Sequence, residues 1–158
     1  MKKTILKLTS ILLIVVGIFS SCKEKEPLEV QLLVNTKWKL VGIMDVQTGI
    51  LTELEPKDCA HCYTLTFDTD DFFWGIMANN MISGNYEIDY KTGVFLFSEI
   101  LCTAAGSIWG EYEDLYLQII GEIQSFILKD TYPRILHLYY NDGKNYLKYK
   151  ETGGQNED

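Results

Sequence analysis

The chain has 158 residues and a formal net charge of −8 at pH 7. This length suits one domain that buries a core without a metal or cofactor, and we expect neither. Residues 1–21 hold three Lys and no acid, so the remainder is more acidic still. Because no stripe of Lys or Arg runs along the sequence, the composition argues against binding to nucleic acid and to anionic lipid headgroups.

Residues 1–21 have the three regions of a bacterial export signal. "MKKTILK" is basic, "LTSILLIVVGIF" is apolar and "SSC" is small, while the apolar run is shorter than the roughly 20 residues of a membrane span. The residues before Cys22 resemble a bacterial lipobox, although Phe19 stands where Leu is usual. We expect a lipoprotein signal peptide over 1–21 and acylation of Cys22; the alternative is an ordinary signal peptide and a chance cysteine.

Residues 22–34 begin with the charged run "KEKEP" after the lipid cysteine and are predicted to form a hydrated tether. Two or more acyl chains would anchor Cys22 firmly, because each buried methylene contributes about 0.8 kcal/mol. The charged run also resembles the surface-export signal of some Gram-negative lipoproteins. We therefore expect a protein anchored to the Gram-negative outer membrane, on its periplasmic or its surface-exposed face.

The chain after the tether alternates short apolar strands with turn residues, which predicts an antiparallel β architecture. Hairpins are predicted around the acidic turn "DTDD", around "YKTG" with Gly93 at positive φ, and around "NDGK". A long loop is predicted over 48–62. The expected strands span 38–46, 63–67, 72–77, 82–89, 94–98, 125–129, 134–140 and 146–150.

The period changes between the fifth and sixth of these strands. Apolar residues there recur at a helical spacing, and the acids, Glu113 among them, fall on the other side. We therefore predict one amphipathic helix. Its apolar positions are Tyr112, Leu115, Tyr116, Ile119 and Ile123.

Four stretches, in this order, resemble the META domain, the family of an HslJ-like bacterial envelope lipoprotein. They are "NTKWKLV", "NNMISGNYEI", "TAAGSIWGEYEDLYLQI" and "RILHLYYNDGKNYLKY". Each motif is short, and their shared order carries the resemblance, which covers about residues 35–150. A lipocalin-like barrel is the alternative.

The resemblance implies an α+β, mainly β fold: a strongly curved antiparallel sheet or partly open barrel with one helix packed against it. It implies no catalytic machinery and a loose link to envelope stress, motility or virulence. Many members have cysteines at the positions of Asn79 and Gly106, so their disulfide is not carried over to this chain. Residues 151–158, after the resembling region, are predicted to form a flexible tail.

With Cys22 acylated, an odd number of cysteines remains: Cys59, Cys62 and Cys102. In an oxidising compartment one pair is expected to form a disulfide and leave one thiol. We favour a local bridge between Cys59 and Cys62 only slightly over a bridge from this loop to Cys102, which would close a longer loop.

The motif "CAHC" has two further interpretations, a thiol oxidoreductase and a zinc site. The first lacks the helix that would lower the pKa of a catalytic thiol. Zinc could use Cys59, His61, Cys62 and Cys102, but a second ligand pair at normal spacing is missing, since His137 stands alone. We therefore expect neither a metal site nor a catalytic residue.

Aromatic residues concentrate at protein interfaces, so Trp74, Trp109 and Tyr112 are candidates for a partner surface. We predict a monomeric, non-enzymatic envelope lipoprotein that binds an unknown protein partner in envelope stress or in contact with a host. One alternative is a lipocalin-like carrier of a small apolar ligand. The other is a periplasmic thiol or metal protein centred on Cys59 and Cys62.

Overall fold

The computed structural model describes residues 33–68 and 71–154. The predicted signal peptide, Cys22 and most of the tether lie outside the described residues, as do residues 69–70 and 155–158. The described residues fall within one structural unit, Leu32–Asp158.

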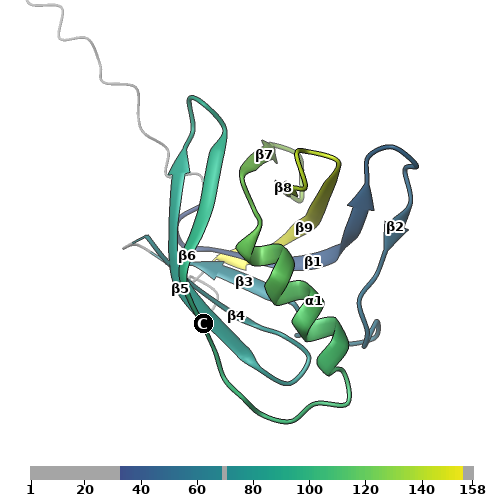
Figure 1. Cartoon of the computed structure of the whole chain (residues 1–158). Helices are drawn as coiled ribbons and strands as arrows, with labels where there is room; N and C mark the ends of the chain where they lie inside the picture. The colour runs from purple at the N-terminus through teal and green to yellow at the C-terminus, as the bar shows by residue number, and fades with distance from the viewer. Residues whose placement is uncertain (1–32, 69–70, 155–158) are drawn as a thin grey trace, which may run out of the picture. The chain divides into compact units, whose positions relative to one another are not determined.

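Strands dominate the described residues, and every pairing between them is antiparallel (Figure 1). Nine strands follow the order β2-β1-β3-β4-β5-β6-β7-β8-β9, and a further pairing of β1 with β9 closes the sheet into a ring. This architecture confirms the predicted fold class, a mainly β fold with one helix. The elements are β1 Thr36–Asp45, β2 Leu51–Thr52, β3 Thr64–Phe67, β4 Phe72–Ile76, β5 Met81–Asp89, β6 Val94–Cys102, α1 Gly110–Gly121, β7 Ser125–Lys129, β8 Ile135–Tyr140 and β9 Asn145–Gly154.

Alternate residues of the longer strands, such as β1 and β5, point into the ring and form the core. In β1, for example, Trp38 is fully buried between the half-buried Lys37 and Lys39. Register shifts between β1 and β9 mark bulges, which bend and twist a sheet and help it to close. The core is rich in aromatic rings that contact one another edge-on or stacked: Phe67, Phe73, Tyr86, Phe95 and Phe97.

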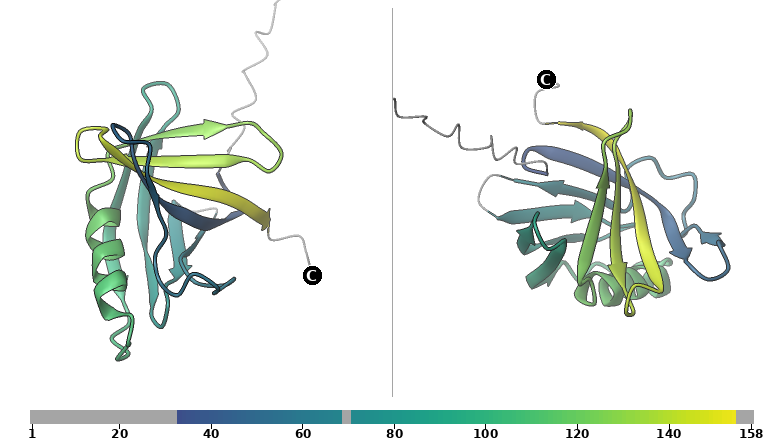
Figure 2. Two further views of the ribbon diagram at one scale, coloured as in Figure 1. Left: turned by 90° about the vertical axis from the view of Figure 1, so that its right-hand side faces the viewer. Right: turned by 90° about the horizontal axis from the view of Figure 1, so that it is seen from above.

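The ring is least closed between β6 and β7, which pair at Val94 and Ser125 alone. Helix α1 connects these two strands and contacts β6. It lies along one side of the ring (Figures 1 and 2). The Tyr116 hydroxyl, fully buried, meets the Tyr149 hydroxyl of β9 at 2.7 Å. The predicted apolar stripe was wrong at one position, since Leu115 is 41% exposed.

The hairpins β3/β4, β5/β6 and β8/β9 confirm the sequence predictions, and both turn glycines have positive φ: 76° at Gly93 and 77° at Gly143. The predicted loop over 48–62 was wrong in part, because it contains the short strand β2. The ordered domain is also longer than predicted. β9 continues to Gly154, within the stretch expected to be a tail, and Leu33 is fully buried in the core.

Candidate functional site

Two adjoining pockets meet at Cys102 and Thr103, where β6 ends. The first has a volume of about 280 Å³ and a mostly apolar lining that includes Trp74, Met81 and Leu101. The second has a volume of about 420 Å³ and lies against the start of α1. Together we call them the β6 groove.

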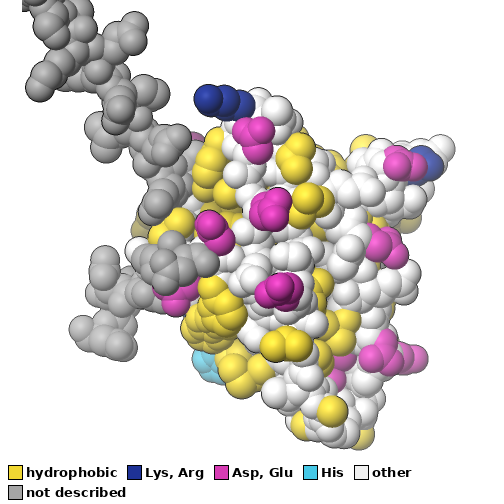
Figure 3. Space-filling view, turned by 60° about the vertical axis from the view of Figure 1, so that its left-hand side comes forward, with side chains coloured by type: hydrophobic (Ala, Val, Ile, Leu, Met, Phe, Trp, Pro, Cys, Tyr) yellow, Lys and Arg dark blue, Asp and Glu magenta, His cyan; other side chains and the backbone are white. Residues whose placement is uncertain are grey.

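The apolar part of the β6 groove follows from the register of three strands. Trp74 pairs with Ser83, and Ser83 pairs with Leu101, so these three side chains share the outer face of the sheet. Leu101 is 70% exposed and Met81 50% exposed. On this side of the molecule, hydrophobic side chains gather among acidic ones (Figure 3). Exposed apolar groups that gather in this way mark binding surfaces more often than isolated ones do.

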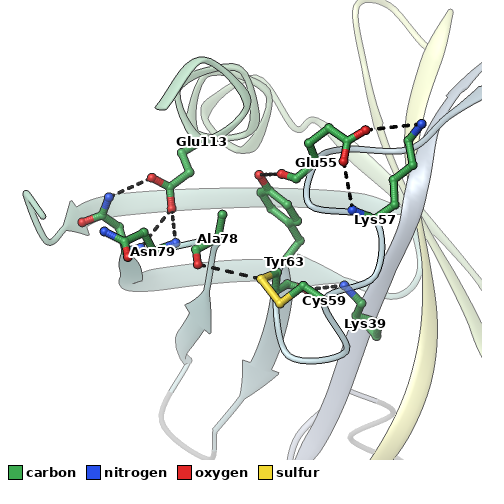
Figure 4. The surroundings of a disulfide bond; sticks show 10 residues. Lys39, Glu55, Lys57, Cys59, Tyr63, Ala78, Asn79 and Glu113 are labelled. Atoms are coloured by element: carbon green, nitrogen blue, oxygen red, sulfur yellow. Dashed lines mark hydrogen bonds and ion pairs between the residues drawn. A yellow bond between two sulfur atoms is a disulfide. The ribbon is translucent and has the colours of Figure 1, made fainter. Parts of the chain in front are cut away.

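The second part of the groove is built around the buried carboxylate of Glu113, in the first turn of α1. One carboxylate oxygen, Oε1, accepts hydrogen bonds from the backbone N–H groups of Asn79, at 2.6 Å, and Asn80, at 2.9 Å. The other, Oε2, accepts one from Asn80 Nδ2 at 2.8 Å. Figure 4 shows Glu113 reaching from the helix to this turn between β4 and β5. The carboxylate therefore holds α1 to the sheet.

Asn80 extends this network to the loop between β6 and α1. Its Nδ2 donates to the carbonyl of Ala105 at 3.0 Å, and its Oδ1 accepts from the Ala105 N–H at 2.7 Å and the Thr103 hydroxyl at 3.1 Å. Next to it, Asn79 Nδ2 donates to the carbonyl of Gly106 at 2.7 Å. These bonds fix the loop that forms one wall of the β6 groove.

The pKa of Glu113 reflects two opposed causes. Burial would raise it, but the hydrogen bonds from Asn79, Asn80 and Ser107 together bring it below its ordinary value. The carboxylate is therefore ionised at neutral pH. Since its oxygens already accept bonds from the protein, we assign it a positioning role and not that of a general base.

Cys102 is the one free cysteine among the described residues, and its side chain is exposed in the groove. Burial of the sulfur, followed by the charges of Glu113 and Asp114, raises the pKa of the thiol. A raised pKa lowers the thiolate fraction, which is the opposite of what a catalytic cysteine needs. Cys102 therefore lacks the lowered pKa of an activated nucleophile.

The other two cysteines lie in the loop between β2 and β3, where a disulfide joins Cys59 and Cys62 (Figure 4). The Lys39 ammonium donates a hydrogen bond to the Cys62 carbonyl, and the Tyr63 hydroxyl donates to the Glu55 carbonyl at 2.7 Å. The disulfide thus fixes a loop that is also hydrogen-bonded to β1. We assign the disulfide a structural role.

The predicted partner residues do not form one surface. Trp74 lies on the outer face of β4 in the β6 groove, whereas Tyr112 packs against the core from α1. Trp109 is the residue before α1, and its ring centroid lies 6.4 Å from that of Tyr112. Only Trp74 of the three contributes to the groove's lining.

The two histidines lie in different surroundings, and only His61 is near the "CAHC" cysteines. His61 is exposed beside the disulfide, whereas His137 is buried and stacks on Tyr146, with ring centroids 4.1 Å apart. Across residues 33–68 and 71–154, no three His, Cys, Asp or Glu side chains are grouped as a metal site requires. In the same ranges, no helix is long and apolar enough to cross a membrane.

Sequence reasoning missed Glu113 and Asn80 as the residues that shape the groove. The helical period placed Glu113 with the exposed acids, and nothing in the local sequence shows that a loop and a turn cover it. An indirect signal was available: "NNM" and "CTAAGS" are polar stretches that contain the matching donors and acceptors.

No family model matches the chain. A protein of Tannerella forsythia named "Putative lipoprotein" is 27% identical over 150 residues, which cover 94% of this chain and 96% of the relative. Because the match covers 94% of this chain, the region of Cys22 lies within the matched residues. The chain is thus similar to a protein that is named as a lipoprotein.

Two solved structures share the fold. An NMR structure of a protein from Burkholderia xenovorans superposes with a TM-score of 0.64 at 22% identity, over 77% of this chain and 85% of that one. The crystal structure of a DUF4847 family protein from Bacteroides vulgatus gives 0.57 at 16% identity, over 75% and 93%. At these identities the likeness concerns the fold alone.

Proposed function

We propose that this protein is an outer-membrane lipoprotein of Gram-negative bacteria, anchored through Cys22, whose domain binds a protein partner in the β6 groove and catalyses no reaction. The observation that carries the binding role is the group of exposed apolar side chains in that groove, Trp74, Met81 and Leu101. The likeness to a lipoprotein supports the anchor.

The partner we propose is a protein that inserts an apolar side chain beside Leu101. Burying one such side chain is worth about 1.5 to 3 kcal/mol, which suits a pocket of this size. The ring interior favours this surface over an internal ligand, because aromatic side chains such as Phe67, Phe95 and Phe97 occupy it. A carrier of the lipocalin type needs open space there.

The META resemblance belongs to the same proposal. The family's two cysteine positions correspond to Asn79 and Gly106, and in this chain the Asn79 side chain donates to the Gly106 carbonyl at 2.7 Å. A hydrogen bond therefore joins the two positions at which many members have cysteines. This contact supports a META-like arrangement of the turn and the loop.

The anchor can be tested by growing cells with an alkyne-labelled fatty acid. We expect the wild-type protein to carry the label and to fractionate with membranes, and Cys22→Ser to lose both properties, because the acyl chains supply the membrane affinity. Cys102→Ser is the matched control and should keep the label. Label retained on Cys22→Ser, or missing from the wild type, would contradict the anchor.

The groove can be tested by placing a photo-reactive amino acid at Met81 in the full-length lipoprotein and irradiating intact cells. We expect a discrete crosslinked protein whose yield falls about tenfold or more with Leu101→Glu, because a charge replaces a buried apolar contact. The same amino acid at Ile50, which is 61% exposed in the turn before β2, should give no such product. Absence of a product at Met81, or one that is indifferent to Leu101→Glu, would refute the proposed surface.

A further inference from the structure

Five lysines that are scattered in the sequence share one outer face of the ring. In β1, Lys37 and Lys39 flank the buried Trp38, and in β9, Lys148 and Lys150 flank the buried Tyr149. We call these four residues and Lys129 of β7 the lysine face. The register places Lys39 opposite Lys150, and Ile135 between Lys150 and Lys129.

The lysine face is unusual in a chain whose net charge is −8. The outward positions that the register assigns to these rows of β1, β7, β8 and β9 hold no Asp or Glu. The acid of β9, Glu151, pairs with Trp38 on the opposite face and forms an ion pair with Arg134. The absence of a lysine stripe in the sequence was therefore misleading, because closure of the ring creates one.

A pocket of about 340 Å³ opens at the edge of this face, between β1, the end of β9 and the disulfide loop. Within residues 33–68 and 71–154, its lining contains two lysine side chains, one imidazole, two threonine side chains, an alanine and a glycine, and no carboxylate. Its polar and backbone lining comes from Lys37, Lys39, His61, Thr64, Thr152 and Gly153.

Lys39 is held in place at the base of this pocket. Its ammonium donates to the carbonyl of Cys62, which leaves two of its three N–H groups for another acceptor. Figure 4 shows the side chain directed at the disulfide loop. Burial lowers the pKa of Lys39, so its charged form lacks the stabilisation that water would give. An anion in the pocket would restore that stabilisation.

Thr64 supplies an independent sign of a binding site. The residue lies opposite Lys39 in the β1/β3 pairing, is only 3% exposed and lines the pocket. Among the described residues, its hydroxyl has no hydrogen-bond partner. Buried hydroxyl groups are nearly always paired, so an unpaired one at a basic pocket points to an acceptor that binds there.

The bulge in β9 completes the wall. Lys37 pairs with Gly153 and Trp38 with Glu151, so Thr152 is the extra residue. Its hydroxyl donates to the Lys37 carbonyl at 3.2 Å, which orients it at the pocket's rim. Bulges commonly redirect side chains at binding sites.

We propose that this pocket binds a phosphate monoester, with Lys37 and Lys39 as the charged donors and Thr64 and His61 beside them. Two lysines match the double negative charge of such a group. A phosphate monoester also offers three terminal acceptor oxygens to these four donor groups, whereas a carboxylate offers two. The same phosphate could be carried by a soluble metabolite or by a lipid headgroup.

The mature lipoprotein in a neutral detergent can be titrated with two probes that carry this group. Glycerol 3-phosphate presents it in solution and dioctanoyl phosphatidic acid presents it on a lipid; glycerol and dioctanoylglycerol are the phosphate-free controls. We expect saturable binding by calorimetry, and NMR shifts at the backbone amides of His61, Thr152 and Gly153. Binding of glycerol 3-phosphate would indicate a soluble source, and binding of phosphatidic acid alone would indicate a headgroup.

Three lysine variants distinguish binding in this pocket from nonspecific electrostatic attraction to the protein. Lys39→Gln should weaken binding about tenfold or more, because a charge-assisted hydrogen bond is lost, while the shorter amide side chain keeps a donor without the charge. Lys37→Gln should do the same without touching that bond. Lys91→Gln removes an equal charge from the exposed β5/β6 turn and should change the affinity less than about twofold. Binding of neither probe, or equal weakening by all three variants, would overturn the proposal.

Discussion

Glu113→Ala should lower the free energy of unfolding by about 3 kcal/mol or more, measured by urea denaturation of the oxidised protein. The substitution leaves three N–H donors without their acceptor: the backbone group and Nδ2 of Asn80, which are buried, and the backbone group of Asn79, which is partly buried. Each unsatisfied donor costs about 1 to 3 kcal/mol, and partial entry of water reduces the sum. The loop that Asn80 holds should also loosen, so the β6 groove should lose its shape.

The pH dependence of the free energy of unfolding separates the effect of the Glu113 charge from that of the side chain's shape. Because the folded protein holds the pKa of Glu113 below its ordinary value, its contribution is fully present above the unfolded pKa of about 4.3. That contribution is lost as the pH falls from there through the lowered folded pKa. Glu113→Gln keeps one oxygen for the two backbone donors but turns an N–H toward Asn80 Nδ2, so it should cost less than Glu113→Ala. The difference in free energy of unfolding between wild type and Glu113→Gln should become smaller at acid pH.

Glu111→Ala is the matched control for Glu113→Ala. It removes an exposed acid from the same helical turn, where interaction with the helix dipole is worth only about 0.3 to 1 kcal/mol. Equal destabilisation by the two substitutions would show that helix charge, and not the buried hydrogen bonds, explains the effect.

The contrast between Glu113 and the hairpins shows which features of this fold the sequence determines locally. A hairpin is specified by a few adjacent residues, so the sequence predicts the positive φ of Gly93 and the turn that contains Gly143. The burial of Glu113 depends on a turn and a loop that contact it. The turn, which contains Asn80, is more than 30 residues away along the chain. Helical periodicity describes one element and carries no information about what covers its polar side.

The lysine face was hidden for the same physical reason. Lys39 and Lys150 are separated by most of the domain and become neighbours only because β1 pairs with β9. The two halves of the groove likewise require the register of β4, β5 and β6, which sets Trp74 and Leu101 on one face. Spacing along the chain predicts which side of a strand a residue takes, but pairing between distant strands decides its neighbours.

Gly75→Ala should be at least as damaging as Glu113→Ala, with a loss of about 3 kcal/mol or more, or failure to fold. A methyl group on Gly75, in the middle of β4, would lie 2.2 Å from the Thr64 carbonyl oxygen and 3.2 Å from a Leu65 methyl. The first atom belongs to the paired strand's backbone, which cannot move without breaking the β3/β4 ladder. Overpacking that side chains can absorb costs about 1 to 3 kcal/mol, and here no flexible side chain gives way.

The same substitution should have the opposite sign at Gly121, in the last turn of α1. A methyl group there would meet no atom within 4 Å, and alanine favours helix by about 0.5 to 1 kcal/mol over glycine. Gly121→Ala should therefore raise the urea midpoint and Gly75→Ala should lower it. Because both changes add one methyl group, opposite signs would show that contact with β3 decides the outcome. A small loss at Gly75 would mean that β3 and β4 lie farther apart than the pairing of Leu65 with Gly75 requires.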